Sequence, residues 1–120
     1  MINEFTDLVV WQIGHETVLL VYKLVGKFPK TETYALVDQL KRAVVSITSN
    51  IAEGFGRKTY KDKVHFYYLS LGSLMEVKNQ LIIAKDLGFI SVDDFTKLLG
   101  KLMDVQRLLL GLIAKTKTFK

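Results

Sequence analysis

The sequence contains no cysteine and only one proline among its 120 residues. Without cysteine the chain forms no disulfide, no thiolate zinc site and no cysteine nucleophile, which is typical of proteins from a reducing cytoplasm. No apolar run approaches the roughly 20 residues that a membrane-spanning helix requires. The first residues read MINEFTD, with acids where a secretory signal peptide carries bases. We therefore expect a cytoplasmic protein.

The few breaks in the sequence divide it into four long segments. Pro29 lies in a short break at 26–32, and glycines mark two more breaks at 54–56 and 88. Apolar residues recur with the 3.6-residue period of a helix in four segments, about 7–27, 32–55, 59–87 and 91–116. Because the connections between them are short, we predict one all-α domain over 1–120, an antiparallel up-down four-helix bundle.

Local signals at the ends of these segments support the same division. Thr59 and Ser91 each precede an aspartate by three residues, which is a pattern typical of a helix N-cap. We expect glycines at 26, at 54 or 56, and at 88 to end the preceding helices in the left-handed conformation.

The apolar residues predict both a core and an interface. The second and fourth segments each carry one core stripe, formed by Leu36, Leu40, Ala43, Val44, Ile47 and Ile51, and by Phe95, Leu98, Leu99, Leu102, Val105, Leu109 and Ile113. The first and fourth segments are apolar on more than one face, at 19–25 and 108–113. Excess apolar surface usually marks an interface, so we expect self-association, with a wide core and scattered exposed leucines as the alternative.

A polar stripe runs along the second segment, and a matching set follows in the third. We expect these residues to form a structural polar network between the two helices, in which Arg42 lies near Glu76 and Gly72 lets the backbones approach closely. Removing one buried partner from such a network costs about 3–5 kcal/mol. The alternative is an acid–base site containing Glu53 and Glu76. The residues of the predicted network are Gln39, Arg42, Ser46, Asn50, Glu53, Ser73 and Glu76, with His65, Gly72 and Gln80 on the same side of the third segment.

Three blocks of sequence carry a resemblance to a known family. They are FTDLVVWQ (5–12), FPKTETYALVDQLKRAVVSITSNIAEGFGR (28–57) and YYLSLGSLMEVKNQLIIAKDLGFI (67–90). In this order and spacing they resemble the four-helix-bundle proteins encoded in 23S rRNA intervening sequences. The resemblance implies an antiparallel bundle that assembles as a homopentamer. The family also includes the accessory variability protein of diversity-generating retroelements, a basic nucleic-acid-binding pentamer that partners a reverse transcriptase.

Signals for metal, cofactor or enzymatic sites are weak. Only Asp62 and His65 approach the Glu-x-x-His spacing of di-iron bundles, and His15 stands alone. Arg57 lies too far before His65 for the arginine–histidine motif of helical RNases, and no GxxxxGK[ST] loop is present. We therefore expect no metal, no cofactor and no enzymatic activity, with a helical RNase as the remaining enzymatic alternative.

Basic residues are expected to gather at one end of the bundle. An up-down bundle places the connection between its second and third helices beside both termini. Seven of the seventeen bases then meet there, against the acids Glu4, Asp7 and Asp62. These bases are Arg57, Lys58, Lys61, Lys63, Lys115, Lys117 and Lys120. The opposite end carries Lys27, Lys30 and Lys85, offset by Glu32, Asp86, Asp93 and Asp94.

This polarity, together with a net charge of +5, predicts binding of RNA or DNA at the basic end. We expect little sequence selectivity, because Phe55 and Tyr60 are the only aromatic residues expected near this end and Phe55 should pack. A solvated end that only aids solubility is one alternative. Another is a scaffold or adaptor that binds a protein such as a reverse transcriptase through its bundle faces.

Overall fold

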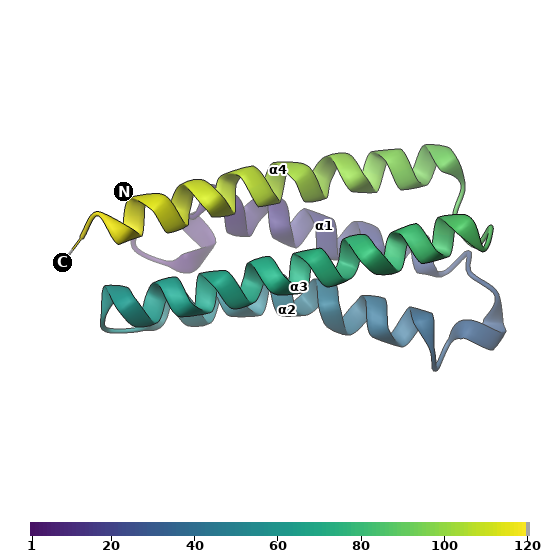
Figure 1. Ribbon diagram of the computed structural model, residues 1–120, viewed down its shortest axis with the longest axis horizontal. Helices are drawn as coiled ribbons and strands as arrows, with labels where there is room; N and C mark the ends of the chain where they lie inside the picture. The colour runs from purple at the N-terminus through teal and green to yellow at the C-terminus, as the bar shows by residue number, and fades with distance from the viewer. Residues whose placement is uncertain (120) are drawn as a thin grey trace.

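A computed structural model describes residues 1–119 of the protein. Four long helices dominate it: α1 (Val9–Val25), α2 (Leu36–Gly56), α3 (Tyr60–Asp86) and α4 (Val92–Lys117). Two short 3-10 helices, η1 (Phe5–Asp7) and η2 (Lys30–Glu32), precede α1 and α2. The helices run up and down, and both termini lie at the end that carries the α2–α3 turn (Figure 1). Consecutive helices pack together and α4 also packs on α1, so the prediction of an all-α four-helix bundle is confirmed.

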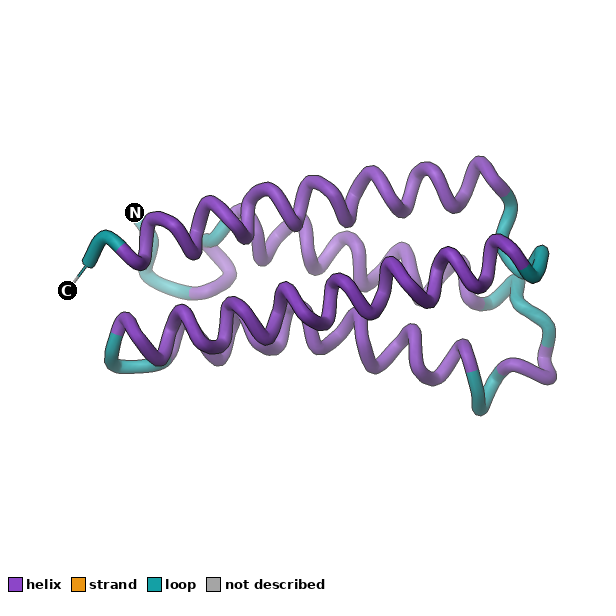
Figure 2. The backbone as a smooth tube through the Cα atoms, viewed as in Figure 1, coloured by secondary structure: helices purple, strands orange, loops and turns teal. Residues whose placement is uncertain are grey.

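The connections are short at one end of the bundle and longer at the other (Figure 2). Thr59 and Ser91 cap α3 and α4 as predicted, because their hydroxyl oxygens accept from the backbone N–H groups of Asp62 and Asp94, each at 3.1 Å. The first residues of α3 are therefore fixed beside the end of α2. This places the side chains of the α2–α3 turn at the end shared with the termini.

The predicted glycine stops are right at only one position. Gly88 adopts a left-handed conformation with φ of 77° after α3. Gly26 instead has a right-handed φ of −61°, and Gly54 and Gly56 lie inside α2. The expectation at these glycines was wrong because α2 ends through the extended backbone of Arg57, which requires no left-handed residue.

The second helix begins four residues later than expected, at Leu36 instead of residue 32. Residues 30–35 form η2 and a turn, and Tyr34 within this stretch is 95% exposed. No side chain caps the N-terminus of α2, and Leu36 and Val37 are its first buried residues. Because packing supplies most of a helix's stability, the helix starts where burial starts.

The core follows the predicted stripes of α2 and α4. All six residues of the α2 stripe are buried, and those of the α4 stripe are buried except for the half-buried Leu99. Within the apolar stretches 19–25 and 108–113, Leu19, Tyr22 and Leu110 are exposed, while the other apolar residues except Gly111 are buried or half-buried. None of the helices over residues 1–119 is both long and apolar enough to cross a membrane.

Candidate nucleic-acid interface

The fold brings basic side chains from three places to one end of the bundle. Arg57 and Lys58 lie in the α2–α3 turn, Lys61 and Lys63 in the first turn of α3, and Lys115 and Lys117 in the last turn of α4. Lys120, the seventh predicted residue, lies outside the described residues. Lys115 and Lys117 also complement the partial negative charge at the C-terminal end of α4. We call Arg57, Lys58, Lys61, Lys63, Lys115 and Lys117 the basic end.

Neighbouring groups hold Arg57, Lys117 and Lys63, and the first two of these remain exposed. The Arg57 Nη2 lies 3.1 Å from the Glu53 Oε1, and the guanidinium carbon lies 4.4 Å from the centroid of the Phe66 ring. The Lys117 Nζ donates to the Tyr68 hydroxyl at 2.7 Å. These contacts fix where the cations lie while leaving them at the surface.

Lys63 is the least available of the six. Its Nζ donates to the backbone carbonyl oxygen of Phe55 and lies 5.3 Å from the centroid of the Phe55 ring. Burial lowers the pKa of the Lys63 ammonium below its usual 10.5. Lys63 therefore satisfies a carbonyl at the end of α2, one of the acceptors that a helix C-terminus leaves open.

The other three cations remain open to a ligand. Lys58, Lys61 and Lys115 are exposed, and none of them forms an ion pair with the described part of the chain. Because exposed, unpaired ammonium groups need shed only water to meet an anion, these three are the readiest contacts for phosphate.

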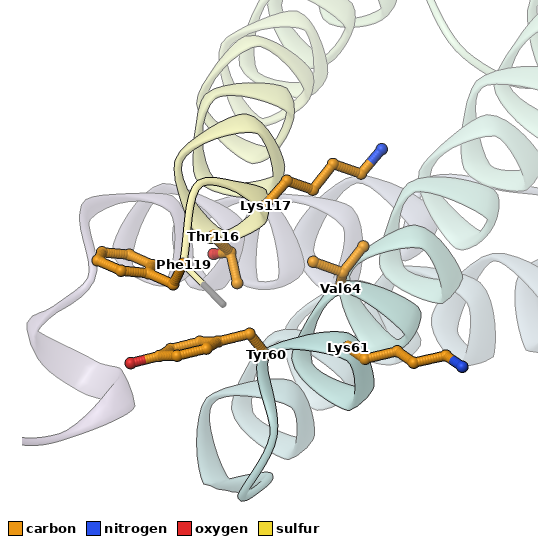
Figure 3. Close-up of a pocket in the computed structure, with 6 residues that line it drawn as sticks. All are labelled: Tyr60, Lys61, Val64, Thr116, Lys117 and Phe119. Carbon is orange, nitrogen blue, oxygen red and sulfur yellow. The ribbon is translucent and has the colours of Figure 1, made fainter.

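An aromatic pair that the sequence alone did not reveal lies beside these lysines. The rings of Tyr60 and Phe119 are stacked, with centroids 5.0 Å apart and planes inclined by 26°. They border a pocket of about 300 Å³ between the start of α3 and the end of α4 (Figure 3). The expectation that Phe55 and Tyr60 are the only aromatic residues near this end was therefore wrong, because nothing in the local pattern shows that Phe119 folds back against α3.

The predicted polar network is reduced to a smaller cluster. The Ser73 Oγ donates to the Ser46 Oγ at 2.9 Å, which joins α3 to α2. The Asn50 Nδ2 donates to the Ser46 backbone oxygen at 2.9 Å and to its Oγ at 3.0 Å. These three residues are brought together as expected.

The charged members of that network find other partners. The Arg42 Nε lies 3.2 Å from the Asp38 Oδ2, and the Arg42 side chain is 80% exposed. Glu53 pairs with Arg57, and the Glu76 Oε1 accepts from the Gln80 Nε2 at 3.2 Å. The expected contact between Arg42 and Glu76 was wrong, because partners four residues apart on one helix meet without crossing between helices. Gln39 is exposed, and its side chain forms no hydrogen bond to the rest of the cluster within residues 1–119.

The close approach of α2 and α3 occurs at a different glycine from the one predicted. A Cβ added to Gly72 would meet nothing within 4 Å, so the expectation for Gly72 was wrong. A Cβ at Gly54 would lie only 2.7 Å from the Tyr67 ring. Nearby, the buried Ser70 Oγ donates to the Ile47 carbonyl oxygen at 2.7 Å. These contacts hold the two helices that carry the α2–α3 turn.

The histidines lie against aromatic rings. His15 stacks on Trp11 with centroids 4.8 Å apart, and His65 meets the edge of Phe66 at 5.4 Å. Within residues 1–119, no group of three or more histidine, aspartate or glutamate side chains is arranged to hold a metal ion. The expectation of no metal and no cofactor stays a prediction.

The geometry defines a class of protein, an all-α four-helix bundle with a basic end. The chain belongs to the 23S rRNA-intervening sequence protein family, whose model matches residues 6–111, so the resemblance predicted from the sequence is confirmed.

The fold is similar to the crystal structure of a protein of unknown function from the S23 ribosomal protein family of Bacteroides thetaiotaomicron. The two chains are 20% identical with a TM-score of 0.80, and the match covers 88% of this chain and 98% of that one. At this identity the likeness establishes the fold alone. Comparison with curated proteins gives no match.

Proposed function

We propose that this protein is a non-enzymatic, homo-oligomeric bundle that binds RNA or DNA through its basic end. The observation that carries the proposal is the placement of Lys58, Lys61 and Lys115, which are exposed at one end without an ion-pair partner among residues 1–119. Membership in a family named for 23S rRNA intervening sequences is consistent with a role close to RNA.

The side chains of the basic end can bind a phosphate backbone in two ways. The lysines act as point charges, whereas the Arg57 guanidinium makes two parallel hydrogen bonds to one phosphate. Arg57 must leave Glu53 to do so, but an exposed pair four residues apart is worth only about 0.3–0.5 kcal/mol. We therefore expect Arg57 to contribute most per residue. Because phosphate contacts carry no sequence information, selectivity among sequences should be low.

Exposed apolar residues support the proposed assembly. An apolar groove between α3 and α4 is lined by Met103 and Leu110, together with Lys78, Gln106 and Arg107. Met75 and Ile82 are exposed and lie on the same side of α3 as Lys78, about one turn to either side of it. The number five comes from the family resemblance. A closed ring would repeat the basic end around an axis and multiply its phosphate contacts.

Salt dependence of binding tests the nucleic-acid proposal. If each of five protomers contacts one phosphate of duplex DNA, log K should fall with log salt with a slope of about −4 to −5. Replacing Arg57, Lys58 and Lys61 together by glutamine should flatten this slope. With fewer cationic side chains at the phosphates, binding releases fewer counterions from the nucleic acid. RNA incubated with the protein should be recovered intact, because we propose that the protein has no nuclease activity.

The matched control replaces Lys27, Lys30 and Lys85 together by glutamine. These lysines lie at the opposite end, so the control should change binding much less. The nucleic-acid proposal fails if the two triple variants bind alike, or if the parent shows no salt-sensitive binding to any RNA or DNA.

Native mass spectrometry tests the assembly. The protein should appear as a closed homo-oligomer, with five copies expected. Leu110→Glu should dissociate it by placing a charge in the α3–α4 groove, whereas Val92→Glu, at an exposed site at the start of α4, should not. A parent that stays monomeric at micromolar concentration would contradict the proposal.

A second candidate function is favoured by the same groove. Its apolar lining suits a protein partner, for which the bundle would act as a scaffold or adaptor, for example for a reverse transcriptase. In that case Leu110→Glu should abolish partner binding while the glutamine variants at the basic end leave it intact.

A further inference from the structure

We propose that the stacked rings of Tyr60 and Phe119 form a stacking site for an unpaired base of single-stranded RNA or DNA. The inference rests on the proposed function and adds to it the form of nucleic acid that the basic end prefers. It would make the protein a single-strand binder with low sequence preference.

The two rings present open aromatic surface at the basic end. Tyr60 is 43% exposed and Phe119 is 47% exposed, although they cover each other by stacking. Flat aromatic faces left in water attract bases, because burial of apolar surface and stacking act together. Since every base has a π-face, such a platform accepts any sequence, which agrees with the expected low selectivity.

Both rings are held in place before a ligand arrives. Tyr60 is the first residue of α3, whose start is fixed by the Thr59 cap. The backbone N–H of Phe119 donates to the Thr116 carbonyl oxygen at 3.2 Å, and the Thr118 Oγ1 donates to the Lys115 carbonyl oxygen at 2.6 Å. These bonds fold the segment after α4 toward α3, so binding need not order it from a free chain.

The pocket beside the rings suits an anionic strand. Val64 and Thr116 line it between the helices, Lys61 and Lys117 line its other side, and its six lining residues include no carboxylate. Its volume of about 300 Å³ is at the lower end of the range of ligand pockets, about 300–1,000 Å³.

The lysines are placed to follow the backbone of a bound strand. Their ammonium groups point away from the rings (Figure 3). A strand that stacks a base on the rings would have to extend across the pocket for its next phosphates to reach these cations. Lys117 is further steadied by its hydrogen bond to Tyr68.

Duplex nucleic acid fits this site less well than a single strand. In a duplex the faces of each base are covered by its stacked neighbours, so only a terminal or extruded base meets the rings. Extruding a base costs a few kcal/mol of unstacking and unpairing. A single strand offers free bases and phosphates at once.

The test compares three fluorescently labelled oligonucleotides of one length: a single strand, the corresponding duplex, and a strand of abasic residues with the same phosphates. The full-length parent should bind the single strand about ten-fold more tightly than the abasic strand, which lies within the range expected for stacking one base. The double variant Tyr60→Leu and Phe119→Leu should lose this difference while keeping the salt slope of the parent. Tyr34→Leu, at the opposite end, serves as the control and should bind like the parent.

The outcomes separate this inference from the proposed function. Equal affinity of the parent for normal and abasic single strands overturns the stacking site, while salt-sensitive binding to both leaves the proposed function standing. Failure of the parent to bind any of the three overturns both. If circular dichroism shows that the leucine variant is unfolded, the abasic comparison on the parent alone decides.

Discussion

The lysines at the two ends of the bundle differ in whether they form ion pairs. At the end that carries the α1–α2 and α3–α4 connections, the Lys27 Nζ lies 3.3 Å from the Asp94 Oδ2, and the Lys85 Nζ lies 3.9 Å from the Asp86 Oδ1. At the basic end, Lys58, Lys61 and Lys115 form no such pair within residues 1–119. One end is therefore close to balanced, whereas the other presents net positive charge.

Asp7 and Glu53, two of the acids near the basic end, have partners other than Lys58, Lys61 and Lys115. The Asp7 Oδ2 accepts from the backbone N–H groups of Asn3 and Glu4, each at 3.0 Å, and these bonds lower the pKa of the Asp7 carboxyl. Glu53 is taken by Arg57. The difference between the ends thus depends on which donors reach each carboxylate, as well as on the number of charges. Counting charges in the sequence captures only the second of these.

The largest losses of stability should come from replacing Gly54, near the basic end, and Gly88, at the opposite end. Gly54→Ala should lower the free energy of unfolding by about 1–3 kcal/mol, because the added Cβ would lie 2.7 Å from the buried Tyr67 ring. Gly88→Ala should cost about 1–2 kcal/mol through its left-handed backbone, where φ is 77°. Urea unfolding measures both.

Two further variants separate the causes. Gly88→Asn should recover much of the loss, since asparagine tolerates the left-handed region. Gly56→Ala, whose Cβ would meet nothing within 4 Å, should be neutral or slightly stabilising. A Gly54→Ala variant as stable as the parent would show that α2 and α3 separate easily near the basic end.

A smaller effect should distinguish buried from exposed polar contacts. Ser70→Ala removes a buried hydrogen bond to the Ile47 carbonyl oxygen and should cost about 1 kcal/mol. Arg42→Ala removes only an exposed ion pair to Asp38 and should cost less than about 0.5 kcal/mol. Denaturant midpoints of the two variants against the parent give the answer. A cost of about 3–5 kcal/mol at Arg42 would restore the network predicted from the sequence.

The smallest effect concerns alkaline pH. Burial raises the pKa of the Tyr67 phenol above its usual 10.0, so the unfolded chain loses this proton at a lower pH than the folded one. The contribution of Tyr67 to stability is therefore complete below pH 10 and is lost as the pH rises through the folded-state pKa. Unfolding curves above pH 10 should show a shallower decline for Tyr67→Phe than for the parent.

Tyr34→Phe at the opposite end is the control for this measurement, because its ring is in water in the folded protein. It should keep the decline of the parent. If Tyr67→Phe and Tyr34→Phe give the same pH profile, burial of Tyr67 does not govern the alkaline loss of stability.

The sequence by itself determined the features that depend on neighbours along the chain. The 3.6-residue period located four helices and the buried stripe of α2, and Thr59 and Ser91 marked the starts of α3 and α4. These predictions succeed because periodicity and capping act within a few residues. The same locality explains why the family blocks were recognisable.

Only the tertiary structure decided what meets across helices. It selected Gly54 instead of Gly72 for the close approach of α2 and α3, paired Arg42 with Asp38 instead of reaching Glu76, and stacked Phe119 on Tyr60. Helical period shows which side of a helix a residue occupies, but the axial offset and rotation of the packed helices fix which side chains touch. The stacked pair joins segments far apart in the chain, so no local pattern could have announced it.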